Sequence, residues 1–100
     1  MRNYEALYII KPELEEEQIA AVVEKYKQLV ADNGGQVTQV EEWGKRKLAY
    51  EVKKYREGYY VLMNFKGTVE TANELDRIFR ISDDVIRYLL VRNEDDKQAS

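Results

Sequence analysis

The chain has 100 residues, of which 44% are hydrophobic and 35% are charged, a composition typical of one folded domain rather than of a disordered polymer. It contains no cysteine and no histidine, which excludes disulfides, thiolate metal ligands and the usual general base of enzymes near neutral pH. The formal net charge of -3 argues against a general polyanion binder but allows a local basic surface.

The N-terminal segment carries an apolar run that is interrupted by charge. Glu5 and Lys11 break the stretch that a signal peptide would need, and no run reaches the roughly 18 apolar residues of a membrane span. We therefore expect a cytosolic protein. Residues 3–10, NYEALYII, are rich in aromatic and β-branched side chains and predict a first strand that ends before Pro12.

A helix is expected next. Apolar residues recur with helical spacing, at Ile19, Val22, Val23, Tyr26 and Val30. This pattern predicts a helix from Glu13 to the glycines at 34 and 35, because glycine ends helices readily.

The middle of the chain is typical of a β-hairpin. Residues 36–52 form a long extended stretch in which Gly44 interrupts the alternation, a position that favours a bulge. A charged turn is expected at 53–58, and the dense apolar run that follows predicts the return strand, so that 36–66 form the hairpin.

The last third of the domain repeats the helix and strand pattern. Residues 71–74, TANE, match a capping box and predict the start of a second helix. Residues 85–92, VIRYLLVR, predict a fourth strand. We expect 1–92 to form a single domain and 93–100 to be a polar, flexible tail.

The order strand, helix, strand, strand, helix, strand is that of an α+β, ferredoxin-like βαββαβ fold, with a four-stranded antiparallel sheet and two helices on one face. The crossover rule then predicts that the first and fourth strands are central neighbours of opposite direction. The second face of the sheet would be open.

Too many apolar residues are present for a sheet that has only one covered face. If Tyr59, Val61 and Met63 point to the helices, a second apolar set points away from them. Apolar patches of this kind mark partner surfaces, although edge twist, the tail or a one-residue register slip would also account for the pattern. The candidate partner-binding residues are Leu7, Ile9, Tyr60, Leu62, Leu89 and Val91.

Basic residues border this set. Between Gly44 and Arg56 the chain carries six basic residues and one acid, a local balance of +5, which would suit RNA or an ordinary solvated surface. The candidate RNA-binding residues are Arg2, Lys45, Arg46, Lys47, Arg87 and Arg92.

Catalysis is poorly supported. Some small domains of this topology are phosphatases that bind phosphate in a glycine-rich loop after the first strand, but here the loop is KPELEEE. Adjacent carboxylates such as Glu41 and Glu42 would point to opposite faces of a strand, and the acids at 94–96 lack the spacing of a calcium loop. We expect no catalytic residue, cofactor, metal, membrane contact or small-molecule substrate.

Four segments carry a family resemblance: RNYEALYIIKPELEEE at the start, WGKRKLAYEV in the second strand, EGYYVLMNF in the third and LDRIFRISDDVIRYLLVR at the end. Together they resemble bacterial small-subunit ribosomal protein six through residues 1–92. The resemblance implies a structural, non-enzymatic role in the cytoplasmic ribosome. It also implies binding to the central domain of small-subunit rRNA together with small-subunit ribosomal protein eighteen, as a heterodimer.

The resemblance also bears on single residues. It makes Arg2, Arg87 and Arg92 candidates for RNA contact, while Arg46 and Tyr50 belong to the signature of the second strand without an assigned role. Glu51 departs from the proline that many members carry after this tyrosine. A rival hypothesis from another class is a domain that self-associates through its open face and ignores RNA.

Overall fold

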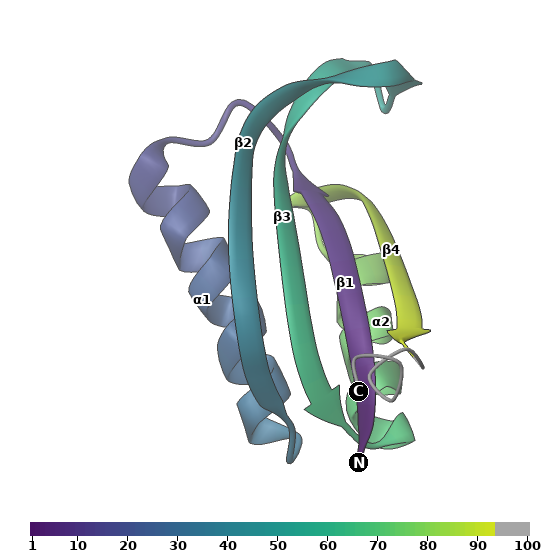
Figure 1. The fold of residues 1–100 in the computed structure, drawn as a ribbon. Coiled ribbons are helices and arrows are strands. Elements are labelled where there is room, and N and C mark those ends of the chain that lie inside the picture. The colour runs from purple at the N-terminus through teal and green to yellow at the C-terminus, as the bar shows by residue number, and fades with distance from the viewer. Residues whose placement is uncertain (94–100) are drawn as a thin grey trace.

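The computed structural model describes residues 1–93, which form two helices and four strands (Figure 1). Both helices cover one face of the antiparallel sheet, and this arrangement confirms the expected ferredoxin-like fold. In chain order the elements are β1 (Arg2–Ile10), α1 (Glu16–Asp32), β2 (Gln36–Val52), β3 (Tyr55–Gly67), α2 (Val69–Ile81) and β4 (Val85–Asn93).

The strand order is β2-β3-β1-β4, so β1 and β3 are the central strands. The prediction that β4 would be central was wrong, although β4 does pair with β1 in the opposite direction. The reason is that β3 pairs with β1 along its whole length, from Arg2 opposite Gly67 to Ile10 opposite Tyr59, and so fills its second side. β4 is therefore left at the edge of the sheet.

The core lies between the sheet and the helices. Tyr4, Ala6, Tyr8 and Ile10 of β1 are buried on this side, as the alternation predicts. The ring of Tyr8 lies 5.1 Å from that of Tyr26 on α1, between ring centroids. Burying an apolar side chain such as Ile10 in this layer contributes about 1.5–3 kcal/mol to folding.

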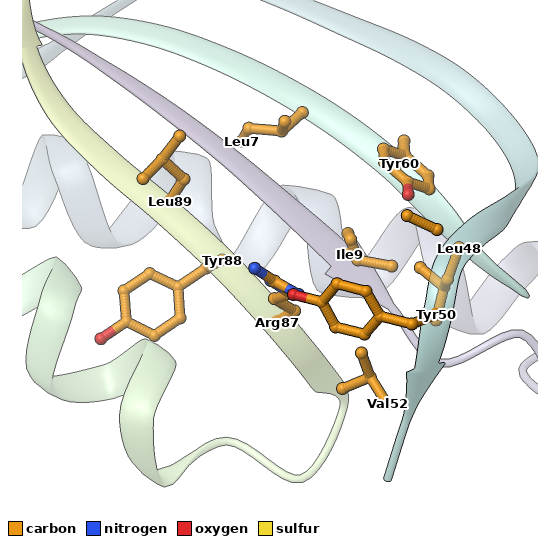
Figure 2. A pocket seen from close by; sticks show the side chains of 10 residues that line it. Leu7, Ile9, Leu48, Tyr50, Val52, Tyr60, Arg87, Tyr88 and Leu89 are labelled. Carbon is orange, nitrogen blue, oxygen red and sulfur yellow. The ribbon is translucent and has the colours of Figure 1, made fainter. Parts of the chain in front are cut away.

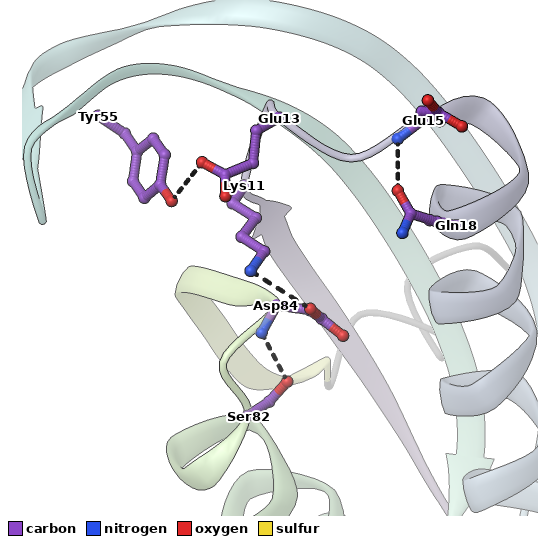
Figure 3. A network of polar contacts seen from close by, with 7 residues as sticks. All are labelled: Lys11, Glu13, Glu15, Gln18, Tyr55, Ser82 and Asp84. Atoms are coloured by element: carbon purple, nitrogen blue, oxygen red, sulfur yellow. Dashed lines mark hydrogen bonds and ion pairs between the residues drawn. The ribbon is translucent and has the colours of Figure 1, made fainter.

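The helix starts differ from the predicted ones. Helix α1 begins at Glu16 rather than Glu13, and the main-chain N–H of Glu15 donates to the Gln18 side chain at 2.9 Å (Figure 3). Helix α2 is capped by Thr68, so the predicted box at 71–74 lies inside the helix. Thr71 is buried instead, and its hydroxyl donates to the carbonyl of Asn33 at 2.8 Å, which ties the two helices together.

The hairpin turn is shorter than predicted. Lys53 and Lys54 both have positive φ, 51° and 72°, which is the backbone of a tight two-residue turn, and β3 begins directly afterwards at Tyr55. The bulge predicted at Gly44 is confirmed by its φ of 87° and by a shift of register beside it. The tip of the hairpin extends past the sheet and curves over its uncovered face (Figure 1).

β4 continues to Asn93, one residue past the predicted end of the domain. The flexible tail predicted for the rest of the chain lies outside the described residues. Neither helix within residues 1–93 has the length and apolar character needed to cross a membrane.

Candidate functional site

The uncovered face of the sheet carries the predicted apolar set. Leu7 pairs with Leu62 on β3 and with Leu89 on β4, and residues paired across strands point to the same face. This register excludes the one-residue slip that the sequence left open. Leu89 and Val91 are 59% and 40% exposed, whereas Ile9 is only 6% exposed. The residues that share this apolar face are Leu7, Ile9, Tyr60, Leu62, Leu89 and Val91.

The hairpin tip turns one end of this face into a pocket of about 330 Å³ (Figure 2). Leu48, Tyr50 and Val52 from β2 line one side, and Arg87 and Leu89 from β4 line the other. No motif indicates that the tip would face β4, because that contact depends on the curvature of the hairpin. The tip residues are therefore the part of the site that sequence reasoning missed.

Tyr50 and Arg87 connect the two sides of the pocket. Arg87 donates a hydrogen bond from Nη1 to the Tyr50 hydroxyl, and its guanidinium carbon lies 5.1 Å from the centroid of the Tyr50 ring. The contact combines hydrogen bonding with a cation–π interaction. Arg87, which we predicted to contact RNA, thus contacts Tyr50 of the hairpin.

A second group of stacked side chains, from β2 and β3, lies farther from the hairpin tip. The Trp43 and Tyr60 rings lie 6.1 Å apart and nearly parallel, and the Arg46 guanidinium carbon lies 5.0 Å from the Trp43 ring. Arg46 is therefore on the uncovered face. Lys45 pairs with Tyr59, whose hydroxyl donates to Glu42 at 2.8 Å on the helix side. The triplet is split between two faces, as period-two geometry predicts.

The candidate RNA-binding residues do not form one surface. Arg2 and Arg92 lie at the end of the sheet where β1 begins, because Arg92 pairs with Tyr4. Arg87 pairs with Ile9 and Arg46 with Gly58, at the other end. By register, Arg92 and Arg87 are five residues apart along the sheet and Arg2 lies seven residues from Ile9, which separates the two groups by about 17–23 Å at the usual strand rise. Two separate basic regions are therefore present.

Charged side chains of the loop after β1 contact neighbouring parts of the protein (Figure 3). Lys11 Nζ lies 3.8 Å from the Asp84 carboxylate, and the Tyr55 hydroxyl donates to Glu13 at 2.9 Å. The hydrogen bond to Glu13 raises the pKa of Tyr55. Within residues 1–93 no group of three acidic side chains is placed to hold a metal ion. The Lys11 ammonium, the cation that a phosphate would need in this loop, is therefore paired with a carboxylate.

Tyr88 attaches β4 to helix α2 and points away from the pocket in Figure 2. Burial raises the pKa of Tyr88, and its hydrogen bond to Asp76, at 2.6 Å, raises it further. This hydrogen bond attaches the strand that carries Arg87 and Leu89 to helix α2.

Comparison with known proteins identifies a matching family. The family model described as Ribosomal protein S6 matches residues 3–92. Small ribosomal subunit protein bS6 of Moorella thermoacetica is 62% identical over 96 residues, which cover 96% of this chain and 98% of that protein. The bS6 protein of Carboxydothermus hydrogenoformans is 52% identical over 94 residues, which cover 94% and 98% of the two chains.

A solved structure extends the likeness to the fold. The crystal structure of 30S ribosomal protein S6 from Thermotoga maritima has a TM-score of 0.92 and 33% sequence identity, and the match covers 98% of this chain and 92% of that one. The family consists of structural proteins of the bacterial small ribosomal subunit, which works in the cytoplasm. The chain belongs to the ribosomal protein S6 family.

Proposed function

We propose that this small-subunit ribosomal protein binds the central domain of small-subunit rRNA as a heterodimer with small-subunit ribosomal protein eighteen. In this proposal the protein is a structural component of the subunit and not an enzyme. The observation that carries the partner assignment is the apolar set on the uncovered face, which no element within residues 1–93 covers completely.

The exposed part of this set supports a protein partner. Leu89 and Val91 keep 59% and 40% of their surface in water although they sit on a sheet whose other side is packed by helices. Their burial against a partner would be favourable by about 25 cal/mol for each Å² removed from water. The pocket beside them can accept an apolar side chain of that partner, with Arg87 and Tyr50 at its rim.

The basic regions support RNA binding at the two ends of the sheet, on either side of the apolar set. Arg2, Lys45 and Lys47 are exposed and suit phosphate contacts. Arg46 and Arg87 stack on aromatic rings, which holds their guanidinium groups in place and leaves further N–H groups for a phosphate. Arg92 completes the proposed set at the end where β1 begins.

The partner assignment can be tested with Leu89→Lys, because this exposed residue can be replaced at little cost to folding. Calorimetric titration with small-subunit ribosomal protein eighteen should give a defined affinity for the wild type and at least a tenfold loss for the variant. Ile81→Lys on helix α2 is the matched control, since Ile81 is also exposed, at 64%. Equal binding by Leu89→Lys, or a stable homodimer that excludes the partner, would contradict the proposal.

A further inference from the structure

The uncovered face becomes polar toward the end where β1 begins. A groove of about 320 Å³ lies there, and its polar lining comes from all four strands: Asn3, Thr38, Asn64, Lys66 and Asn93. Asn3 pairs with Lys66 on β3 and with Asn93 on β4, which places these three side chains side by side. None of the six apolar candidates lines this groove.

The groove offers both donors and acceptors. Each asparagine amide has two N–H donors and one acceptor oxygen. The Thr38 hydroxyl donates to the carbonyl oxygen of Asn64 at 3.2 Å, and the Asn64 amide donates to Gln39 at 3.5 Å, which fixes this side of the groove. Within residues 1–93 the side chains of Asn3 and Lys66 form no hydrogen bond or ion pair and remain available to a ligand.

The charges around the groove are mixed. Lys66 lies in it, whereas Arg2 precedes Asn3 and Arg92 pairs with buried Tyr4, so that strand alternation directs both arginines to the other face. Glu5 borders the inner side, because it pairs with Asn64. A ligand that fits must therefore be anionic at one point and carry a neutral hydroxyl close by. A ribose–phosphate unit has this chemistry, since the phosphate needs a cation and the ribose 2′-hydroxyl both donates and accepts.

We propose that this groove binds the ribose–phosphate backbone of RNA, with Lys66 on a phosphate and the Asn3 and Asn64 amides on a 2′-hydroxyl. The inference rests on the proposed function and adds to it the part of the RNA that this end of the face recognises. It also gives the two parts of the face different ligands, so that the apolar set takes the protein partner and the amide-lined groove takes RNA.

The test is 2′-deoxy interference on a central-domain rRNA fragment, in which each molecule carries one deoxynucleotide at a random position. The full chain, with small-subunit ribosomal protein eighteen present, separates bound from unbound fragments. The wild type should show interference at one or more positions. Asn3→Ala and Asn64→Ala should abolish interference there and weaken binding roughly three- to tenfold, the value of one or two hydrogen bonds.

Two further variants keep the test decisive. Asn73→Ala, an exposed asparagine on helix α2, should leave both the affinity and the interference pattern unchanged. Lys66→Ala should weaken binding but retain the 2′-deoxy interference, which separates the phosphate contact from the ribose contact and serves if Asn64→Ala folds poorly. Unchanged affinity and interference in Asn3→Ala, while the wild type binds, would overturn this inference alone. Failure of the wild type to bind with the partner present would overturn the proposed function as well.

Discussion

Tyr50 and Arg87 lie 37 residues apart in the chain and close the hairpin tip over the uncovered face of the sheet, where the arginine donates a hydrogen bond to the tyrosine hydroxyl. This contact joins the end of β2 to the edge strand β4, two elements that are not neighbours in the sheet. The pocket beside Ile9 exists because of it, since its walls come from these two strands.

The first prediction concerns this contact. Tyr50→Phe retains the ring against Arg87 but removes the hydrogen bond, so amide hydrogen exchange in residues 48–56 should become faster. The loss of global stability should be below about 1 kcal/mol, because Tyr50 is 59% exposed and water replaces part of the bond. Tyr60→Phe is the control, since its ring stacks on Trp43. Equal exchange at the tip in all three proteins would show that the hydrogen bond does not hold the tip.

The second prediction compares two glycines. A Cβ at Gly58 would overlap Cγ2 of buried Ile9, so Gly58→Ala should cost about 1–3 kcal/mol of unfolding free energy. At Gly44 there is open space, and Gly44→Ala should cost about 1–2 kcal/mol through its positive φ alone.

Steric overlap at Gly58 and backbone strain at Gly44 can be separated by denaturant unfolding of double variants. Ile9→Ala should recover part of the stability lost in Gly58→Ala, because it removes the overlapping methyl group. The same change should add its full cost to Gly44→Ala, with no coupling between the sites. Equal coupling energies at the two glycines would contradict this explanation.

The third prediction concerns a buried hydroxyl. Tyr8 is fully buried, and within residues 1–93 its hydroxyl has no hydrogen-bond partner. Tyr8→Phe should therefore raise the unfolding free energy at pH 7 by about 1 kcal/mol. Tyr88→Phe is the matched control and should lower it, because that hydroxyl donates to Asp76.

The pH dependence of Tyr8 has a definite sign. Burial raises the pKa of Tyr8 above its usual range, with the nearby Tyr26 and Glu42 adding to the effect. The unfolded chain ionises near pH 10, so stability is retained below that pH and falls as the pH rises past it. Tyr8→Phe should lose less stability than the wild type between pH 10 and pH 11. A parallel loss in both proteins would assign the alkaline transition to other groups.

The fourth prediction concerns the salt dependence of RNA binding. Arg2→Ala and Arg92→Ala should each weaken binding to the rRNA fragment and reduce the slope of log affinity against log salt by about 0.7–0.9. Arg77→Ala on helix α2 is the control, because Arg77 is paired with Glu74 at 2.6 Å. Filter binding at several salt concentrations measures the slopes. Unchanged slopes in both variants would remove these arginines from the RNA interface.

Much of the fold and of the apolar face could be predicted from local pattern. The alternation along β1 determines that Leu7 and Ile9 point away from the core, and the same period in β3 and β4 brings Leu62 and Leu89 beside Leu7. Features that depend on distant contacts could not. The edge position of β4 is one of these features, because its sequence does not reveal that β3 fills the other side of β1.

The start of helix α2 and the pocket could not be predicted from the sequence either, because both depend on contacts between residues far apart in the chain. Both Thr68 and Thr71 have the side chain of a helix cap, and only the buried position of Thr71 against Asn33 decides between them. Tyr50 and Arg87 meet because the long hairpin curves, a property of the folded sheet that no short motif encodes. The amide-lined groove draws on four separate strands and carries no signature in any of them.

The most direct test of the central claim is the affinity of this chain for a central-domain rRNA fragment, measured with and without small-subunit ribosomal protein eighteen at two salt concentrations. The account predicts tight binding only with the partner present, together with a marked loss of affinity at the higher salt. No binding under any of these conditions, or binding that neither the partner nor salt alters, would contradict it.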